Sequence, residues 1–218
     1  MPTMACHCEA TDRHFGLARA QKELAAYRRR GAKGTAWQLL RMLRDSHARA
    51  DTLLDIGAGV GVLHHELLSD GVRDAVHVEA ATAYIHVAQD EANRRGHAER
   101  VQFLHGDFLT LAPAIAPADL VTLDRVLCCY PDLEPLLLAS AARTRRYWAA
   151  SFPRDRWYVR VHTRWQNRLR ARAGNAFRTF VHPVARIYEL LGRTGLRPLR
   201  VWRRPVWEVV LCIREDAG

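Results

Sequence analysis

The stretch Thr52-Leu53-Leu54-Asp55-Ile56-Gly57-Ala58-Gly59-Val60-Gly61 decides the fold of this chain. It begins as a short apolar run, which is typical of a buried strand, and it ends in glycines at positions 57, 59 and 61. Glycine at such a turn lets the backbone bend sharply and lets a ligand approach without a Cβ in the way. The nicotinamide-dinucleotide fingerprint would place its third glycine at position 62, where this chain has Val62. The turn therefore predicts a ligand site at the end of a strand, without the dinucleotide spacing.

Segments with strand and helix character alternate around this turn. Expected strands span 52–56, 75–79, 101–104, 119–123 and 147–152, and expected helices span 62–69, 84–95, 133–145 and 184–193. Such alternation predicts an α/β fold, a parallel sheet with helices on both faces. Two further strand-like runs, 199–203 and 206–214, stand too close together for a parallel crossover, so we expect them to form an antiparallel hairpin.

The chain of 218 residues is long enough for one well-buried domain, expected over 51–218, after a helical leader over 1–50. No apolar run reaches the ~18 residues that span a bilayer. No secretory signal is recognisable at the start, so a cytoplasmic protein is expected. Five cysteines are too few for a disulfide framework, and Cys6-His7-Cys8 lacks the second ligand pair of a typical zinc site. We expect no metal.

Polar residues also follow the other predicted strands. Glu79-Ala80 ends the second strand, Gly106-Asp107-Phe108 follows the third, and Asp124-Arg125 follows the fourth. Ligands of parallel sheets bind beyond the carboxyl ends of the strands, so these segments should surround one pocket with the glycine turn. A carboxylate in the place of Glu79 can accept hydrogen bonds from both hydroxyls of a ribose.

The glycine spacing, with an acid before the first glycine, resembles motif I of the class I S-adenosylmethionine-dependent methyltransferases, and the likeness extends over about 53–152. The resemblance implies a Rossmann-like, seven-stranded mixed sheet with an antiparallel last strand, and S-adenosylmethionine as the methyl donor. It also implies that Asp107 reaches the adenine amino group, that Phe108 packs on the ring, and that Asp124-Arg125 lies beside the methionine moiety. The predicted cofactor-binding residues are Asp55, Gly57, Ala58, Gly59, Gly61, Glu79, Ala80, Gly106, Asp107, Phe108, Asp124 and Arg125. Tyr27 and Arg30 of the leader join them, if an arginine there meets the cofactor carboxylate rather than solvent.

A narrower likeness joins residues 121–131 and 180–183 to the magnesium-protoporphyrin O-methyltransferases. That family tends to have His-Tyr where this chain has Cys129-Tyr130, so the reaction class is better supported than a porphyrin acceptor. Tyr130 and His182 are the candidate catalytic residues, although each has a structural alternative, as a packed ring or a structural histidine. Cys128 and Cys129 read as small buried hydrophobes.

Positive charge is concentrated in one stretch. Residues 143–178 contain eleven arginines and a single acid, Asp155, while the formal net charge of the whole chain is +10. At about 154–176 two series recur every four residues and predict an amphipathic helix: Trp157, Val161, Trp165 and Leu169, and Arg156, Arg160, Arg164, Arg168 and Arg172.

Three interpretations of this helix stay open. It could pack on the domain through its tryptophans with the arginines in water. It could be a lid whose Arg160, Arg164 and Trp165 contact an anionic substrate. It could be a surface for nucleic acid or an anionic membrane.

The sequence thus predicts methyl transfer from S-adenosylmethionine to a small molecule, at oxygen, with an anionic or carboxylate-bearing acceptor that contacts Tyr130 and the basic helix. An RNA or other phosphate-rich substrate is an alternative, as is a cofactor-binding partner protein without activity. The segment Asp124-Arg125-Val126-Leu127 differs from the Asn/Asp-Pro-Pro-aromatic segment usual in enzymes that methylate amino groups of DNA. The acceptor, the methylated atom and the oligomeric state are not set by the sequence.

Overall fold

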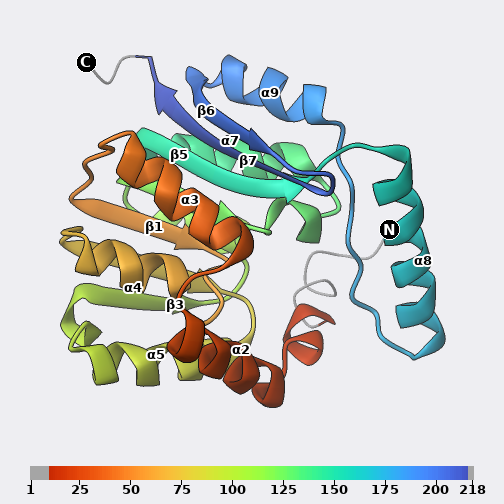
Figure 1. The fold of residues 1–218 in the computed structure, drawn as a ribbon, viewed down its shortest axis with the longest axis horizontal. Helices are drawn as coiled ribbons and strands as arrows, with labels where there is room; N and C mark the ends of the chain where they lie inside the picture. The colour runs from red at the N-terminus through yellow and green to blue at the C-terminus, as the bar shows by residue number, and fades with distance from the viewer. Residues whose placement is uncertain (1–9, 216–218) are drawn as a thin grey trace.

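The computed structural model describes residues 10–215 and has a seven-stranded sheet with helices on both faces (Figure 1). The strand order is β3-β2-β1-β4-β5-β7-β6. The strands are β1 (Thr52–Ile56), β2 (Asp74–Glu79), β3 (Val101–His105), β4 (Ala118–Asp124), β5 (Thr144–Pro153), β6 (Leu196–Arg203) and β7 (Trp207–Arg214). Strand β7 runs antiparallel to both of its neighbours, while the other pairs are parallel. The mixed sheet and the C-terminal hairpin expected from the sequence are confirmed.

The helices divide between the two faces of the sheet. They are α2 (Leu17–Arg30), α3 (Gly34–Asp45), α4 (Val62–Ser69), α5 (Thr82–Arg95), α6 (Phe108–Leu111), α7 (Leu133–Ala142), α8 (Trp157–Arg172) and α9 (Val184–Arg193), with short 3₁₀ turns η1 (Ala98–Arg100), η2 (Ala112–Ala114) and η3 (Leu127–Cys129). One core cluster joins α3 and α4 to the sheet through side chains such as Leu40 and Leu67, and another joins α7 and α9 through Leu136 and Ile187. Burial on both faces explains why the central strands are nearly continuous apolar runs.

Most expected elements agree with the structure to within a few residues, and the segments 52–56, 62–69 and 184–193 agree at both ends. The helix expected over 133–145 was too long, because α7 ends at Ala142. Thr144 already pairs with Ala118 of β4, so the sheet takes residues that local sequence would allow in a helix. Strand pairing between distant segments decides this boundary.

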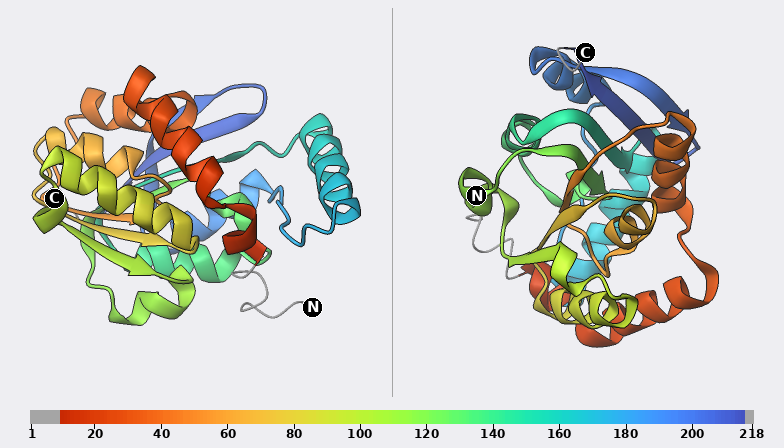
Figure 2. Two further views of the ribbon diagram at one scale, coloured as in Figure 1. Left: turned by 90° about the horizontal axis from the view of Figure 1, so that it is seen from below. Right: turned by 90° about the vertical axis from the view of Figure 1, so that its left-hand side faces the viewer.

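Helix α8 stands apart from the two helical layers. It leaves the carboxyl end of β5 and lies beyond the carboxyl ends of the parallel strands (Figure 2). Within the helix only Val159 is buried. Among residues 10–215, no helix is both long and apolar enough to cross a membrane. Cys6, His7 and Cys8 lie outside the described residues.

Candidate cofactor and acceptor site

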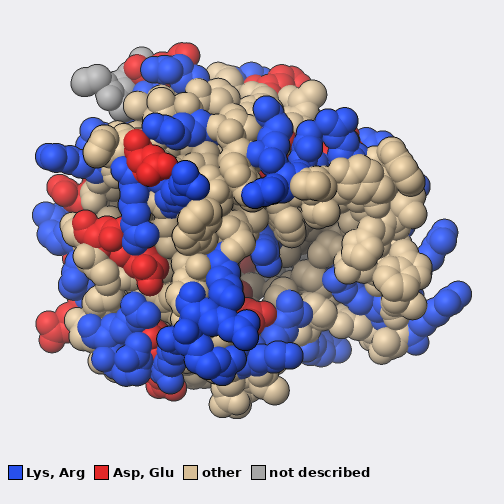
Figure 3. Space-filling model, viewed as in Figure 1, with Lys and Arg blue, Asp and Glu red and all other residues tan. Residues whose placement is uncertain are grey.

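A cavity of about 370 Å³ lies at the carboxyl ends of the strands, within the range of small-molecule sites. Figure 3 shows the surface hollowed between the main body and the α8 segment at the right-hand side. Its lining includes twelve of the residues predicted from the sequence: Asp55, Gly57, Ala58, Gly59, Glu79, Ala80, Gly106, Asp107, Phe108, Asp124, Arg125 and Tyr130. The fold therefore brings the four strand-end segments together.

The three glycines of the turn differ in the space around them. All three have positive φ, which favours glycine, with values of 62° at Gly57, 60° at Gly59 and 84° at Gly61. A Cβ at Gly57 would lie 2.5 Å from Cγ2 of Val126, and one at Gly61 would collide with His64. A Cβ at Gly59 would meet only Tyr84, at 3.8 Å. Gly61 does not line the cavity, contrary to the expectation, because it begins α4 and packs against that helix.

Glu79 ties the glycine turn to the end of β2. Its Oε2 accepts the N–H of Gly59 at 2.9 Å, and its Oε1 accepts the N–H of Ala81 at 2.9 Å. Burial raises the pKa of Glu79, while these backbone donors oppose the rise. The carboxylate thus stands at the cavity wall with its oxygens held in a fixed direction.

Asp107 and Tyr130 form a pair at another wall. The Tyr130 hydroxyl donates to Oδ1 of Asp107 at 2.5 Å. The other oxygen, Oδ2, is buried and has no hydrogen-bond partner within residues 10–215. Leaving such an acceptor unsatisfied costs about 1–3 kcal/mol, so the geometry favours a ligand that supplies a donor.

Two more carboxyl groups lie beneath the turn. Asp55 is fully buried; Thr122 donates to its Oδ1 at 2.7 Å, and burial raises its pKa to about 7. Asp124 accepts a hydrogen bond from the Ser151 hydroxyl at 2.5 Å, and burial raises its pKa as well. Hydrogen bonds from side chains of β4 and β5, Thr122 and Ser151, therefore hold the two carboxyl groups in place.

Arg125 connects the β4 loop to two other elements. Its backbone has a positive φ of 61°, an uncommon conformation for a residue with a side chain and one that collects at functional sites. Its Nε donates to Oγ1 of Thr35 at 3.0 Å, and its guanidinium lies 4.9 Å from the ring centroid of Trp207. The strained loop is thereby held between α3 and β7.

Two leader residues predicted to meet the cofactor lie outside the cavity. The Tyr27 hydroxyl donates to Oε1 of Glu66 at 2.7 Å, and Tyr27 packs between α4 and α5 with Arg95 over its ring. Arg30 is exposed. The predicted face of α2 was wrong because Ala20, Leu24 and Tyr27 share the face that packs on α5. The leader instead lines the cavity with Thr11, His14, Phe15, Arg19 and Glu23.

The three residues of α8 predicted to contact a substrate are also outside the cavity. Arg160 pairs with Asp155, and Arg164 and Trp165 are exposed. Arg170 lines the cavity instead, with Nη1 donating to Oδ1 of Asn167 at 3.0 Å and to Oγ1 of Thr179 at 3.1 Å.

The interpretation of a helix packed through its tryptophans is wrong as well, since Trp157 is 76% exposed and Trp165 is 56% exposed.

His182 is a structural residue rather than a cavity residue. Its Nε2 lies 3.1 Å from the carbonyl oxygen of Leu127 and 3.0 Å from that of Tyr130. Because carbonyl oxygens only accept, Nε2 carries the proton, which leaves Nδ1 as the basic nitrogen of the ring. The cavity lining does not include His182, so the predicted role as catalytic base is not supported, and the residue instead holds η3 and the loop after it.

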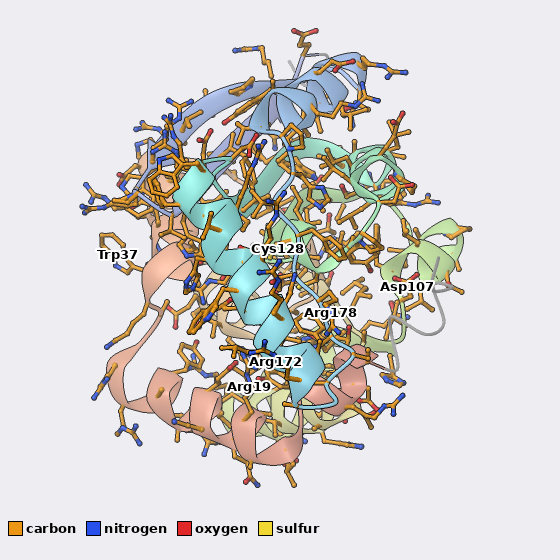
Figure 4. The ribbon with its side chains drawn as sticks, turned by 90° about the vertical axis from the view of Figure 1, so that its right-hand side faces the viewer. Arg19, Trp37, Asp107, Cys128, Arg172 and Arg178 are labelled. Atoms are coloured by element: carbon orange, nitrogen blue, oxygen red, sulfur yellow. The ribbon has the colours of Figure 1, made fainter. Side chains whose placement is uncertain are left out.

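The outer part of the cavity collects cationic side chains that the sequence did not single out. Arg19 and Arg170 both line it, and burial lowers the pKa of Arg170, with the nearby charges of Arg19 and Arg178 adding to the effect. Figure 4 shows Arg19 and Arg178 beside the lower end of α8. Burial lowers the pKa of the lining residue His14 to about 4, so it is neutral at pH 7. Since Arg19 also pairs with Glu23 at 3.1 Å, the positive charge left for an anion in this part of the cavity is chiefly that of Arg170.

Comparisons with known proteins agree with the fold. Residues 53–146 match the model of the family described as methyltransferase domain. No curated protein matches the sequence. The structure is similar to that of a magnesium protoporphyrin IX methyltransferase from Synechocystis PCC 6803 with bound SAH, at a TM-score of 0.68 and 19% identity over 94% of this chain and 98% of that chain. It is also similar to a putative sarcosine dimethylglycine methyltransferase from Galdieria sulphuraria, at a TM-score of 0.65 and 15% identity over 84% of this chain and 86% of that chain. An O-methyltransferase family protein from Burkholderia thailandensis matches at a TM-score of 0.64 and 15% identity over 84% of this chain and 59% of that chain.

Proposed function

We propose that the chain is a class I S-adenosylmethionine-dependent methyltransferase and that it methylates an oxygen atom of a small anionic acceptor. The observation that carries the acceptor class is Arg170, in the wall of the same cavity as the glycine turn, because the other cavity arginine, Arg19, is already paired with Glu23 at 3.1 Å. Guanidinium groups bind carboxylates through paired, charge-assisted hydrogen bonds. The remainder of the cavity is assigned to the cofactor.

The cofactor end of the cavity suits S-adenosylmethionine in its donors, acceptors and space. Glu79 would accept hydrogen bonds from the ribose hydroxyls, and the unpartnered Oδ2 of Asp107 would accept one from the adenine amino group. The open approach at Gly59 would admit the methionine moiety beside Asp124 and Arg125. The leader would close over the cofactor with residues of 11–23, rather than with Tyr27 and Arg30.

Catalysis by this chain would rest on positioning. Bound S-adenosylmethionine supplies a methyl group already activated by its sulfonium. Holding two reactants in line is worth up to ~7–11 kcal/mol, and an acceptor oxygen that is already ionised needs no general base. The cavity side chains fit this requirement, because a pKa of about 4 makes His14 a weak base. A hydrogen bond with Cys128, together with burial, raises the pKa of Cys129 well above its usual value, so its thiol stays protonated.

Tyr130 would act as a positioning residue. Its hydroxyl is hydrogen-bonded to Asp107, so the phenol would orient the carboxylate that accepts the adenine amino group, while the ring forms part of the cavity wall. A porphyrin carboxylate is one acceptor worth testing, because the first of the similar structures is a magnesium protoporphyrin IX methyltransferase.

The test is turnover of S-adenosylmethionine to S-adenosylhomocysteine with a panel of aromatic carboxylates, phenols, magnesium protoporphyrin IX and RNA. We expect turnover with a carboxylate or another ionised oxygen acceptor. Cofactor binding without turnover on any acceptor would favour a partner protein without activity, and turnover on RNA alone would contradict the small-molecule proposal.

A matched pair of variants then tests the arginine. Arg170→Gln removes a cavity cation, whereas Arg172→Gln removes an exposed cation two residues further along the same helix. Since a hydrogen bond to a charged group is worth about 1.5–3 kcal/mol, Arg170→Gln should raise the acceptor KM by about 10- to 100-fold and leave cofactor affinity unchanged. Equal effects of the two variants would refute the role of Arg170.

A further inference from the structure

The solvent-facing side of α8 carries a row of large apolar side chains that the cavity does not account for. We define this outer face by Trp157, Val161, Arg164, Trp165, Arg168 and Leu169. Its four apolar members are 76%, 56%, 56% and 42% exposed in chain order. Soluble proteins seldom leave such a row of large apolar side chains uncovered, so this face indicates an interaction surface.

Contacts on the other side of the helix fix this orientation. Val159 is buried, and the Asn167 side chain both donates to the carbonyl oxygen of Thr179 at 2.7 Å and accepts its N–H at 3.0 Å. At the start of the helix, the Tyr158 hydroxyl donates to the carbonyl oxygen of Pro205 at 2.5 Å. These contacts anchor the helix along its length by its inner side, and its tryptophans cannot turn inward without breaking the hydrogen bonds.

The charges around the outer face select among partners. Within residues 156–178 there is no acidic residue, and Figure 3 shows blue arginine groups interleaved with tan side chains along this edge. A second copy of the chain would bring two arginine-rich faces together, which is repulsive. Nucleic acid would pair with the arginines and stack on the two tryptophans, but it would leave the aliphatic Val161 and Leu169 without an apolar partner.

A lipid interface suits both the apolar side chains and the arginines of the outer face. Tryptophan rings and aliphatic side chains enter the region between headgroups and acyl chains, while arginines stay at the level of lipid phosphates. Val206 extends the apolar contact at one end, since it is exposed and its carbonyl oxygen accepts the N–H of Arg154 just before the helix. We propose that the outer face of α8 docks this protein on an anionic lipid bilayer, with the helix lying in the plane of the interface.

The experiment is co-sedimentation of the full chain, without cofactor or acceptor, with vesicles of phosphatidylcholine alone or mixed with phosphatidylglycerol. We expect retention on the anionic vesicles at low salt, weakening as salt rises, and much weaker retention on phosphatidylcholine. Brominated lipid should quench tryptophan fluorescence in the anionic vesicles. Equal retention on the two vesicle types, or none on either, would overturn the proposal.

Three double variants separate the contributions. Trp157→Ala/Trp165→Ala should lower vesicle affinity at least 10-fold and remove most of the quenching, with circular dichroism unchanged. Arg164→Gln/Arg168→Gln should also lower it, at about 5-fold per arginine. Arg145→Gln/Arg197→Gln removes the same charge from exposed positions at the opposite end of β5 and should have little effect. Unaltered binding by the tryptophan variant would refute the outer face as the contact, as would tight RNA binding through these residues with no affinity for vesicles.

Discussion

Replacing His77 with phenylalanine should make the protein more resistant to acid. His77 belongs to a cluster of buried histidines beneath the glycine turn, with His64, His65 and His97. Its Nδ1 lies 3.4 Å from Nδ1 of His64, and its Nε2 has no partner among the described residues. Burial lowers the pKa of His77 well below 6.5, and it lowers the pKa of His64 to about 3.

The sign of the effect follows from these shifts. The unfolded chain binds a proton at His77 below pH about 6.5, whereas the folded chain keeps the ring neutral. Stability from this site is therefore complete above pH 6.5 and falls as the pH drops toward the folded pKa. At pH 5 the loss amounts to about 2 kcal/mol for one such histidine. The raised pKa of Asp55 acts in the opposite direction, but it is present in both proteins and cancels in the comparison.

The assay is urea denaturation of wild type and His77→Phe between pH 8 and pH 5. Phenylalanine brings a packing cost of its own, which does not depend on pH, so the informative quantity is the change in the free-energy difference with pH. We expect that difference to move by about 2 kcal/mol in favour of the variant by pH 5. His86→Phe, at an exposed position on α5, should run parallel to wild type. A pH-independent difference for His77→Phe would refute the account of a neutral buried cluster.

Two further predictions concern the cofactor. Gly59→Val should abolish S-adenosylmethionine binding in calorimetry, because valine is strained at a φ of 60° and its branches would occupy the cavity wall. Gly57→Ala should instead lower the melting temperature, because its Cβ would lie 2.5 Å from Val126. Wild-type affinity in Gly59→Val would remove the turn from the site. Glu79→Ala should weaken cofactor binding by about 10-fold or more, since hydrogen bonds to a charged group are worth about 1.5–3 kcal/mol each. Unchanged affinity would mean that another acid meets the ribose.

The cavity wall around the glycine turn was predictable because its information is local. The predicted wall residues lie at or just after the carboxyl end of a short strand, as Asp55 and Asp107 do, and parallel pairing places all such ends at one edge of the sheet. Gly61 shows a limit of prediction from local sequence, because it fits the glycine pattern and yet does not line the cavity. Its left-handed backbone is required by the start of α4, so a glycine pattern alone cannot separate turn geometry from ligand contact.

The outer part of the cavity was not predictable because its residues come from distant segments and depend on the rotation of one helix. His14, Arg19, Arg170 and Trp207 meet only in three dimensions. A repeat of four residues advances about 40° beyond a full turn at each step, so Trp157 and Leu169 point about 120° apart rather than along one packed stripe. The side that faces the body passes through Val159 and Arg170, which belong to neither repeat. Because Val159 is the buried residue of α8, the tryptophans of the first repeat face outward, and Arg170 rather than an arginine of the second repeat lines the cavity.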